Sequence, residues 1–263
     1  MEIKNTKDYD DVASIVALVY GVGGVGKTTM ATTFPKPILL DFENGAKYFK
    51  QRGIDVDVVK MNAWFTEDDK KQLAKEIESY DTIVLDPIGE AMEKLIKSPH
   101  ITGSKYRQSD GSLTIGGWGK AKEDFRLLMK WMRDTGKNVV LVAHVNEKSD
   151  DESLVKRPLI ATKIVDEIIA MVDIVGYLDI VNDEGVEKRI LRVNPADKKF
   201  IAKDRTGALE NIVKPEYEYI HKMIKSKQKG VKKEVKKAPA KKSKVTKVSE
   251  KEIKKSNPFN KKK

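Results

Sequence analysis

The sequence predicts an α/β fold with a mostly parallel sheet, helices on both of its faces and an antiparallel hairpin at one edge. Short apolar runs recur along the chain and alternate with stretches of helical composition, which is the pattern of consecutive βα units. One apolar run leads directly into a glycine-rich segment, and two late runs flank a polar turn at residues 182–185, as expected for a hairpin.

The expected strands are nearly continuous apolar runs, as strands covered on both faces require. In chain order they are residues 14–20, 37–42, 56–60, 82–86, 138–143, 174–181 and 188–193. The expected helices are residues 28–33, 66–79, 89–97, 120–135 and 164–172. Residues 98–119 and 146–156 are polar and are expected to form loops.

Basic charge is concentrated at the C-terminal end of the chain. The whole sequence has 51 Lys and Arg against 40 Asp and Glu, but residues 225–263 alone hold 17 Lys and 3 Glu, so the rest is slightly acidic. These residues include few aliphatic side chains and cannot bury enough apolar surface to offset the entropy of ordering. We therefore expect one folded core over residues 1–224 and a disordered Lys-rich tail that binds nucleic acid. A solubilising tail or an arm for an acidic protein is the alternative.

Composition excludes several classes of site. There are no cysteines, which excludes disulfides and cysteine nucleophiles, and only three histidines, which disfavours a multi-histidine metal site. The longest near-apolar run, residues 12–20, is shorter than the roughly 20 residues that a membrane-spanning helix needs. The N-terminal residues lack the basic start and apolar core of a signal peptide. The sequence therefore predicts a cytoplasmic protein with no membrane partner.

The segment from Gly21 to Thr28 matches the phosphate-loop pattern G-x-x-x-x-G-K-[ST] in full. It follows an apolar strand and precedes a helix, which is the context that supports such a match. Glycines let consecutive backbone N–H groups point at phosphate oxygens, Lys27 would neutralise phosphate charge, and the Thr28 hydroxyl would bind Mg²⁺. The expected nucleotide-binding residues are Gly21, Val22, Gly23, Gly24, Val25, Gly26, Lys27, Thr28 and Thr29.

Polar residues also follow three other expected strands. Asp86 ends the strand at 82–86, where a second carboxylate would hold Mg²⁺ through water. Glu43 follows the strand at 37–42 and could orient and deprotonate the attacking water, a role for which Asp41 competes. His144 follows the strand at 138–143, where a polar side chain can contact the γ-phosphate, although a lone histidine is often only structural.

The order of these pieces resembles the RecA-type ATPase core over roughly residues 10–210. In that family a phosphate loop is followed by a strand ending in Asp-x-Glu, a strand ending in Asp and a strand ending in a polar sensor, which match Asp41-Phe42-Glu43, Asp86 and Ala143-His144. The chain is most similar to small phage and prophage nucleotide-binding proteins that include the Sak-type single-strand annealing recombinases. The resemblance implies ATP and Mg²⁺ as cofactors, Glu43 as the water-activating residue and His144 as the sensor.

Lys203 and Arg205 resemble the Lys-x-Arg pair of RecA-like and hexameric helicase cores. In those proteins the two cations reach the γ-phosphate of the neighbouring subunit. The resemblance therefore implies a homo-oligomer, a ring or a filament, with a shared active site in which arginine stabilises the charge of phosphoryl transfer. The alternative is that both side chains are solvent-facing charges.

The resemblance also implies that residues 98–119 and 146–163 contact single-stranded DNA. The first segment and its boundary carry Lys105, Tyr106, Arg107, Trp118 and Lys120, which can bind phosphates and stack on bases, although Trp118 can instead pack against the next helix. The second carries Lys148, Lys156, Arg157 and Lys163, but also acidic residues. Together with the Lys-rich tail, the resemblance implies a phage-encoded, DNA-stimulated ATPase of the bacterial host cytoplasm that promotes annealing and recombination. A single-stranded DNA-binding protein is a further expected partner.

Other families share the loop but fit less well. ParA-related partitioning ATPases have a signature Lys where this chain has Val22, and signalling NTPases with similar loops carry repeats, of which this sequence shows none. Two alternatives stay open: a helicase- or loader-type motor with little recombinase activity, and a nucleotide-gated nucleic-acid-binding scaffold with negligible turnover.

Overall fold

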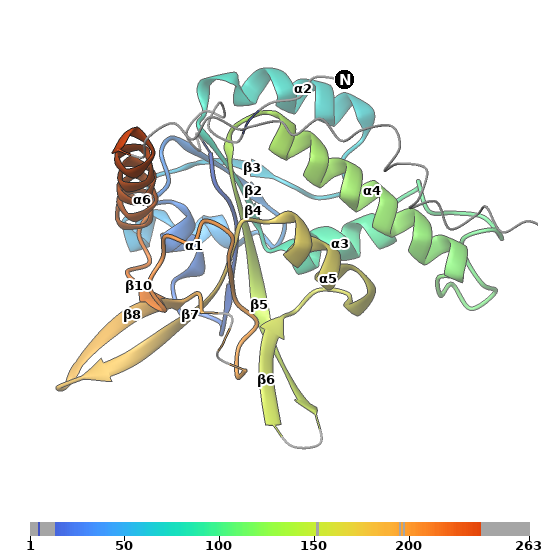
Figure 1. Ribbon diagram of the computed structural model, residues 1–263. Helices are drawn as coiled ribbons and strands as arrows, with labels where there is room; N and C mark the ends of the chain where they lie inside the picture. Colours follow the sequence, from blue (N-terminus) through green and yellow to red (C-terminus); the bar gives the residue numbers. More distant parts are fainter. Residues whose placement is uncertain (1–4, 6–13, 151–152, 195, 197, 238–263) are drawn as a thin grey trace, which may run out of the picture. The chain divides into compact units, whose positions relative to one another are not determined.

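The computed structural model describes residue 5 and residues 14–150, 153–194, 196 and 198–237 (Figure 1). The chain forms two compact units, Met1–Gln228 and Lys229–Lys263, and the first contains the whole sheet. Within the described residues the strands are β1 (Val16–Gly21), β2 (Pro37–Asp41), β3 (Asp57–Lys60), β4 (Thr82–Asp86), β5 (Asn138–Asp150), β6 (Ser153–Pro158), β7 (Ile174–Asp183), β8 (Val186–Arg192), β9 (Lys203–Asp204) and β10 (Ile212–Val213).

The predicted fold class is confirmed. The strand order is β10-β8-β7-β1-β5-β4-β2-β3, in which the six strands from β7 to β3 run parallel. Strand β8 pairs antiparallel with β7 and forms the predicted edge hairpin, and β6, β9 and β10 add further antiparallel pairs. The helices are α1 (Lys27–Ala31), α2 (Glu67–Glu76), α3 (Ile88–Ile96), α4 (Ile115–Asp134), α5 (Thr162–Met171) and α6 (Tyr217–Lys237), with short 3-10 turns η2 (Gly45–Tyr48), η3 (Lys50–Arg52) and η4 (Ile77–Ser79).

Helices cover both faces of the sheet, which is why its central strands are apolar throughout. Alternate residues of β1 point to opposite faces, so Leu18 belongs to the cluster under α2, α3, α4 and α5, whereas Val19 belongs to the cluster under α1 and α6. Both side chains are fully buried. The two apolar layers fix the sheet and hold the carboxyl ends of its parallel strands at one edge.

Residues 146–156 were predicted to be a loop, and this prediction is wrong. Strand β5 continues past the sheet to Asp150 and pairs with β6 in an antiparallel arm, with Val145 opposite Pro158 at its base. Figure 1 shows this arm projecting from the body, apart from the β7–β8 hairpin. The segment was predicted as a loop because most of its residues are polar, so it lacks the apolar pattern by which strands are recognised.

Helix α4 begins at Ile115, inside the segment 98–119 that was predicted to be a loop. Thr114 caps the helix, because its hydroxyl oxygen accepts a hydrogen bond from the N–H of Gly117 at 3.0 Å. A β-carbon on Gly117 would lie 2.2 Å from the carbonyl oxygen of Tyr106. The glycine is therefore a close-packing residue within a helix, although glycines usually indicate a loop.

Helix α6 extends to Lys237, so residues 225–237 are helical where disorder was predicted. Tyr217, Ile220 and Ile224 bury one side of its first turns in the core, and lysine and glutamate are good helix formers that allow the helix to continue. Residues 238–263 of the predicted tail lie outside the described residues. No helix in the described part of the chain is both long and apolar enough to span a bilayer.

Candidate nucleotide-binding site

The predicted site residues meet at the carboxyl ends of four neighbouring parallel strands. Gly21 at the end of β1 lies in register with His144 of β5, and Asp41 at the end of β2 lies in register with Asp86 of β4. Ligands of open α/β sheets bind at this edge, outside the carboxyl ends of the strands. A cavity of about 130 Å³ lies there, lined by Gly24, Gly26, Lys27, Thr28, Leu39, Asp41, Glu43, Gly45, Ala46, Phe49, Arg52, Asp86 and His144.

The phosphate loop curls through two glycines in the left-handed region, Gly24 with φ of 77° and Gly26 with φ of 104°. The ammonium group of Lys27 donates hydrogen bonds to the carbonyl oxygens of Gly21 at 3.1 Å and Val22 at 2.8 Å. Burial lowers the pKa of Lys27, and the nearby carboxylates of Asp86 and Glu43 partly oppose that shift. A buried cation held by the loop itself is suited to bind the phosphates of a nucleotide.

Thr28 and Asp86 provide adjoining oxygen atoms, as predicted for a magnesium site. The Thr28 hydroxyl donates to Oδ2 of Asp86 at 2.5 Å. Burial raises the pKa of Asp86 to about 6, against the lowering effect of the Thr28 hydrogen bond and of Lys27. No cluster of three acidic or histidine side chains that could hold a metal alone occurs among the described residues. The Thr28–Asp86 pair fits Mg²⁺, which binds proteins through one or two side-chain oxygens and takes its other ligands from phosphates and water.

Glu43 and His144 face each other across the cavity, with Oε2 and Nε2 3.5 Å apart and both side chains more than two-fifths exposed. Asp41, the other candidate for water activation, is 4% exposed. Its carboxylate accepts hydrogen bonds from the N–H groups of Glu43, Gly45 and Ala46 and so holds the turn after β2. Of the two carboxylates, Glu43 is therefore the one that solvent can reach.

The structure does not bring Lys203 and Arg205 to the cavity of their own chain. Lys203 donates to the carbonyl oxygens of Ile169, Ala170 and Val172 at 2.7–3.0 Å, at the C-terminal end of α5. Arg205 donates to the carbonyl oxygen of Ala170 at 2.7 Å and forms an ion pair with Asp173. Both cations therefore satisfy the last carbonyl groups of a helix, and contact with a neighbouring subunit stays a prediction.

Several of the predicted DNA-contacting side chains serve the fold. Arg107 donates to the carbonyl oxygens of Ile96, Ile101 and Gly111, Trp118 packs against the apolar core, and Lys120 pairs with Asp124. Lys105 and Tyr106 lie side by side near the surface, with the ammonium group 5.4 Å from the ring centroid.

In the second segment the base of the β5–β6 arm is tied to the sheet. Lys156 contacts the Tyr177 hydroxyl at 3.2 Å and lies over the rings of Tyr177 and Phe200. Arg157 pairs with Asp166 of α5 at 3.3 Å. The side chains of Lys148 and Lys163 lie outside the described part of the structure.

Two arginines beside the phosphate loop were not predicted from the sequence. Arg189 of β8 donates from Nε to the carbonyl oxygen of Val25 at 3.0 Å, and Arg52 of η3 lines the cavity. Residues 25 and 189 are 164 positions apart, so no spacing pattern relates them. Only the folded sheet, which places the β7–β8 hairpin next to β1, brings them together.

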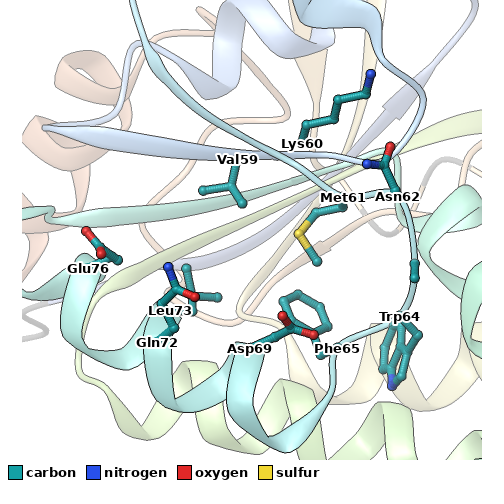
Figure 2. A pocket seen from close by; sticks show the side chains of 11 residues that line it. Val59, Lys60, Met61, Asn62, Trp64, Phe65, Asp69, Gln72, Leu73 and Glu76 are labelled. Atoms are coloured by element: carbon teal, nitrogen blue, oxygen red, sulfur yellow. The ribbon is translucent and has the colours of Figure 1, made fainter.

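A separate cavity of about 320 Å³ lies at the β3 edge of the sheet, between the end of β3 and α2 (Figure 2). Val59, Met61 and Leu73 form much of its apolar lining. Of its two acidic residues, Asp69 and Glu76, the first accepts hydrogen bonds from the backbone N–H and hydroxyl of Thr66 in a capping box at the start of α2. None of the predicted site residues lines this cavity, so we assign the nucleotide to the carboxyl ends of the central strands.

The chain is similar to several known proteins. Solved structures similar to the chain include the KaiC-like protein PH0186 from Pyrococcus horikoshii OT3 (15% identity, 68% of this chain and 77% of that chain covered, TM-score 0.40). They also include the flagellar accessory protein FlaH from Methanocaldococcus jannaschii (10% identity, 76% and 83% covered, TM-score 0.42). No curated protein sequence matches significantly. A family model described as an AAA domain matches residues 13–206, well over half of the chain, and the protein therefore belongs to this family of nucleotide-binding P-loop ATPases.

Proposed function

We propose that the protein is a Mg²⁺-dependent ATPase that binds single-stranded DNA and promotes strand annealing in recombination, as phage-encoded Sak-type proteins do. The observation that carries the ATPase part is the convergence of Lys27, the Thr28–Asp86 pair and the Glu43–His144 pair on one cavity. The two members of each pair come from separate segments of the chain, and phosphoryl transfer needs this combination of phosphate, metal and water contacts.

In this proposal each side chain has a defined task. The loop N–H groups and Lys27 bind the phosphates, Thr28 and Asp86 hold Mg²⁺, and Glu43 accepts the proton of the attacking water. Bound Mg²⁺ would neutralise the charge that develops on the phosphate oxygens. His144 contacts Glu43 at 3.5 Å, so it is placed to orient this carboxylate and to respond to loss of the γ-phosphate.

The DNA part of the proposal is supported by the continuity of β5. This strand carries His144 at the cavity and continues into the β5–β6 arm, so one continuous strand joins the nucleotide site to a projecting surface. A change at His144 is therefore transmitted to the arm without an intervening loop. DNA bound along the arm and by the Lys-rich C-terminal residues would in turn influence hydrolysis, because coupling between two sites is reciprocal.

A nucleotide-gated scaffold is the second candidate function, and one observation favours it. Lys203 and Arg205 are engaged at the end of α5, so a monomer has no arginine from this pair at the phosphates. A supplied arginine accelerates hydrolysis by several orders of magnitude in related chemistry. The isolated chain is then expected to bind ATP and hydrolyse it slowly.

The test is the ATP hydrolysis rate of wild type and Glu43→Gln with and without single-stranded DNA, at fixed salt. The proposal expects turnover that single-stranded DNA raises, and ATP binding without turnover in the variant. ATP binding with negligible turnover under every condition would favour the scaffold. Normal turnover by Glu43→Gln would refute the assignment of water activation to Glu43.

A further inference from the structure

A larger cavity adjoins the phosphate loop beside the one that contains Glu43. Its volume is about 770 Å³, and it shares Gly26 and Arg52 with the smaller cavity as lining residues. Met30 of α1 and Leu178 of β7 contribute apolar parts of its wall. The smaller cavity, at about 130 Å³, falls below the roughly 300 Å³ at which small-molecule sites begin, whereas the larger one is within that range.

The larger cavity carries an excess of positive charge. Of its four cations, Lys188 pairs with Asp183 at 2.5 Å and Lys214 pairs with Glu216 at 2.8 Å. The other two are guanidinium groups, and neither forms an ion pair with a carboxylate in the described part of the chain. They are Arg52, whose side chain makes no hydrogen bond there, and Arg189, which donates from Nε to the carbonyl oxygen of Val25.

Arg189 lies against Gly26, and Arg52 lines both cavities together with Gly26. A β-carbon on Gly26 would lie 3.1 Å from Nε of Arg189, so this guanidinium group is directly against the loop backbone. The terminal nitrogens of Arg189 and the whole Arg52 guanidinium remain available as donors. Guanidinium groups bind phosphate oxygens through paired N–H donors in a fixed geometry.

We propose that Arg52 and Arg189 bind the nucleotide where its phosphate chain passes over Gly26, and that the larger cavity receives the ribose and base. This inference rests on the proposed nucleotide-binding function and assigns its ligand to both cavities. The γ-phosphate then lies near Glu43 and His144, and the nucleoside lies between α1 and the β7–β8 hairpin. Arg189 would link that hairpin to the bound nucleotide.

The test is isothermal titration calorimetry with Mg²⁺ and two ligands, ATP and inorganic triphosphate, which lacks the nucleoside. Wild type is expected to bind ATP at least about tenfold more tightly than triphosphate, because only ATP fills the larger cavity. Arg52→Ala and Arg189→Ala are each expected to lower the affinity for both ligands about tenfold, which corresponds to the loss of about one charge-assisted hydrogen bond. Arg52→Lys and Arg189→Lys should recover part of the loss by keeping the charge.

Arg133→Ala is the matched control, because it removes another exposed arginine, one on α4 that pairs only with its neighbour Asp134 among the described residues. Its affinities should equal those of wild type. Thermal unfolding of each variant shows whether a loss of affinity comes from a missing ligand contact or from a destabilised fold. If wild type binds ATP but both alanine variants bind it equally well, the arginine assignment is overturned while the ATPase proposal stands. Equal affinity of wild type for triphosphate and ATP overturns the cavity assignment, and no binding of either ligand by wild type overturns the proposed function itself.

Discussion

Replacing Asp86 by Asn should stabilise the protein at neutral pH and abolish its hydrolysis. Burial raises the pKa of Asp86 from an ordinary 3.8 to about 6, so the folded state disfavours the ionised carboxylate. Two pKa units correspond to about 3 kcal/mol at about 1.36 kcal/mol per unit. Asn cannot ionise and can still accept the Thr28 hydrogen bond, so it avoids this cost. For a domain of this size the gain predicts a rise in Tm of roughly 6–12 °C.

The sign of the pH dependence follows from proton linkage. Between pH 3.8 and about 6 the folded protein binds a proton that the unfolded chain has released, so wild-type stability falls as pH rises through this window. The advantage of Asp86→Asn should therefore be complete above pH 6 and vanish below about pH 4. Urea unfolding of both proteins at pH 4 and pH 7.5 measures this difference in the free energy of unfolding.

Asp68→Asn is the control, because its carboxylate is almost fully exposed and its removal should change stability little at either pH. With saturating Mg²⁺ and ATP, wild type should become more stable than Asp86→Asn, since binding of these ligands stabilises wild type and requires the ionised Asp86. A variant that is less stable than wild type at pH 7.5 without ligand would refute the reasoning. So would an advantage that is the same at both pH values.

Three further outcomes are expected. Gly117→Ala should lower the free energy of unfolding by more than about 2 kcal/mol, on the order of an overpacked core site, because its β-carbon would lie 2.2 Å from the carbonyl oxygen of Tyr106. Urea unfolding measures this loss, and a change below about 0.5 kcal/mol would contradict the close approach. Arg205→Ala should keep ATP affinity but lose the hydrolysis of the assembled protein, and mixing it with Lys27→Ala should restore part of the rate if subunits share a site; a mixture as inactive as either variant argues against sharing. Removing residues 238–263 should weaken single-stranded DNA binding and reduce the slope of log K against log salt, as measured by fluorescence anisotropy, and an unchanged slope would assign the tail to another partner.

The parts of the fold that were predicted correctly are those with a local signal. Strands such as β4 are apolar on both faces, and the phosphate loop is a contiguous motif in its expected context. The β5–β6 arm was missed because most of its residues are polar, and the start of α4 was missed because Gly117 serves packing. The choice between Asp41 and Glu43 could not be made from the sequence, since it depends on which backbone N–H groups the Asp41 carboxylate accepts.

The raised pKa of Asp86 also connects the fold to the proposed chemistry. A carboxylate buried beside Lys27 and Thr28 is costly in the free protein, and a bound cation would remove that cost by favouring the ionised form. Burial of the ionised Asp86 carboxylate costs the ligand-free protein about 3 kcal/mol. Metal and nucleotide, which remove this cost, should therefore stabilise the carboxyl ends of β1 and β4 together. His144 lies on β5, which separates these two strands, and we therefore expect their stabilisation to extend to the β5–β6 arm. Hydrogen exchange of the arm amides, faster without ligand than with Mg²⁺ and ATP, would measure this coupling, and identical exchange in both states would contradict it.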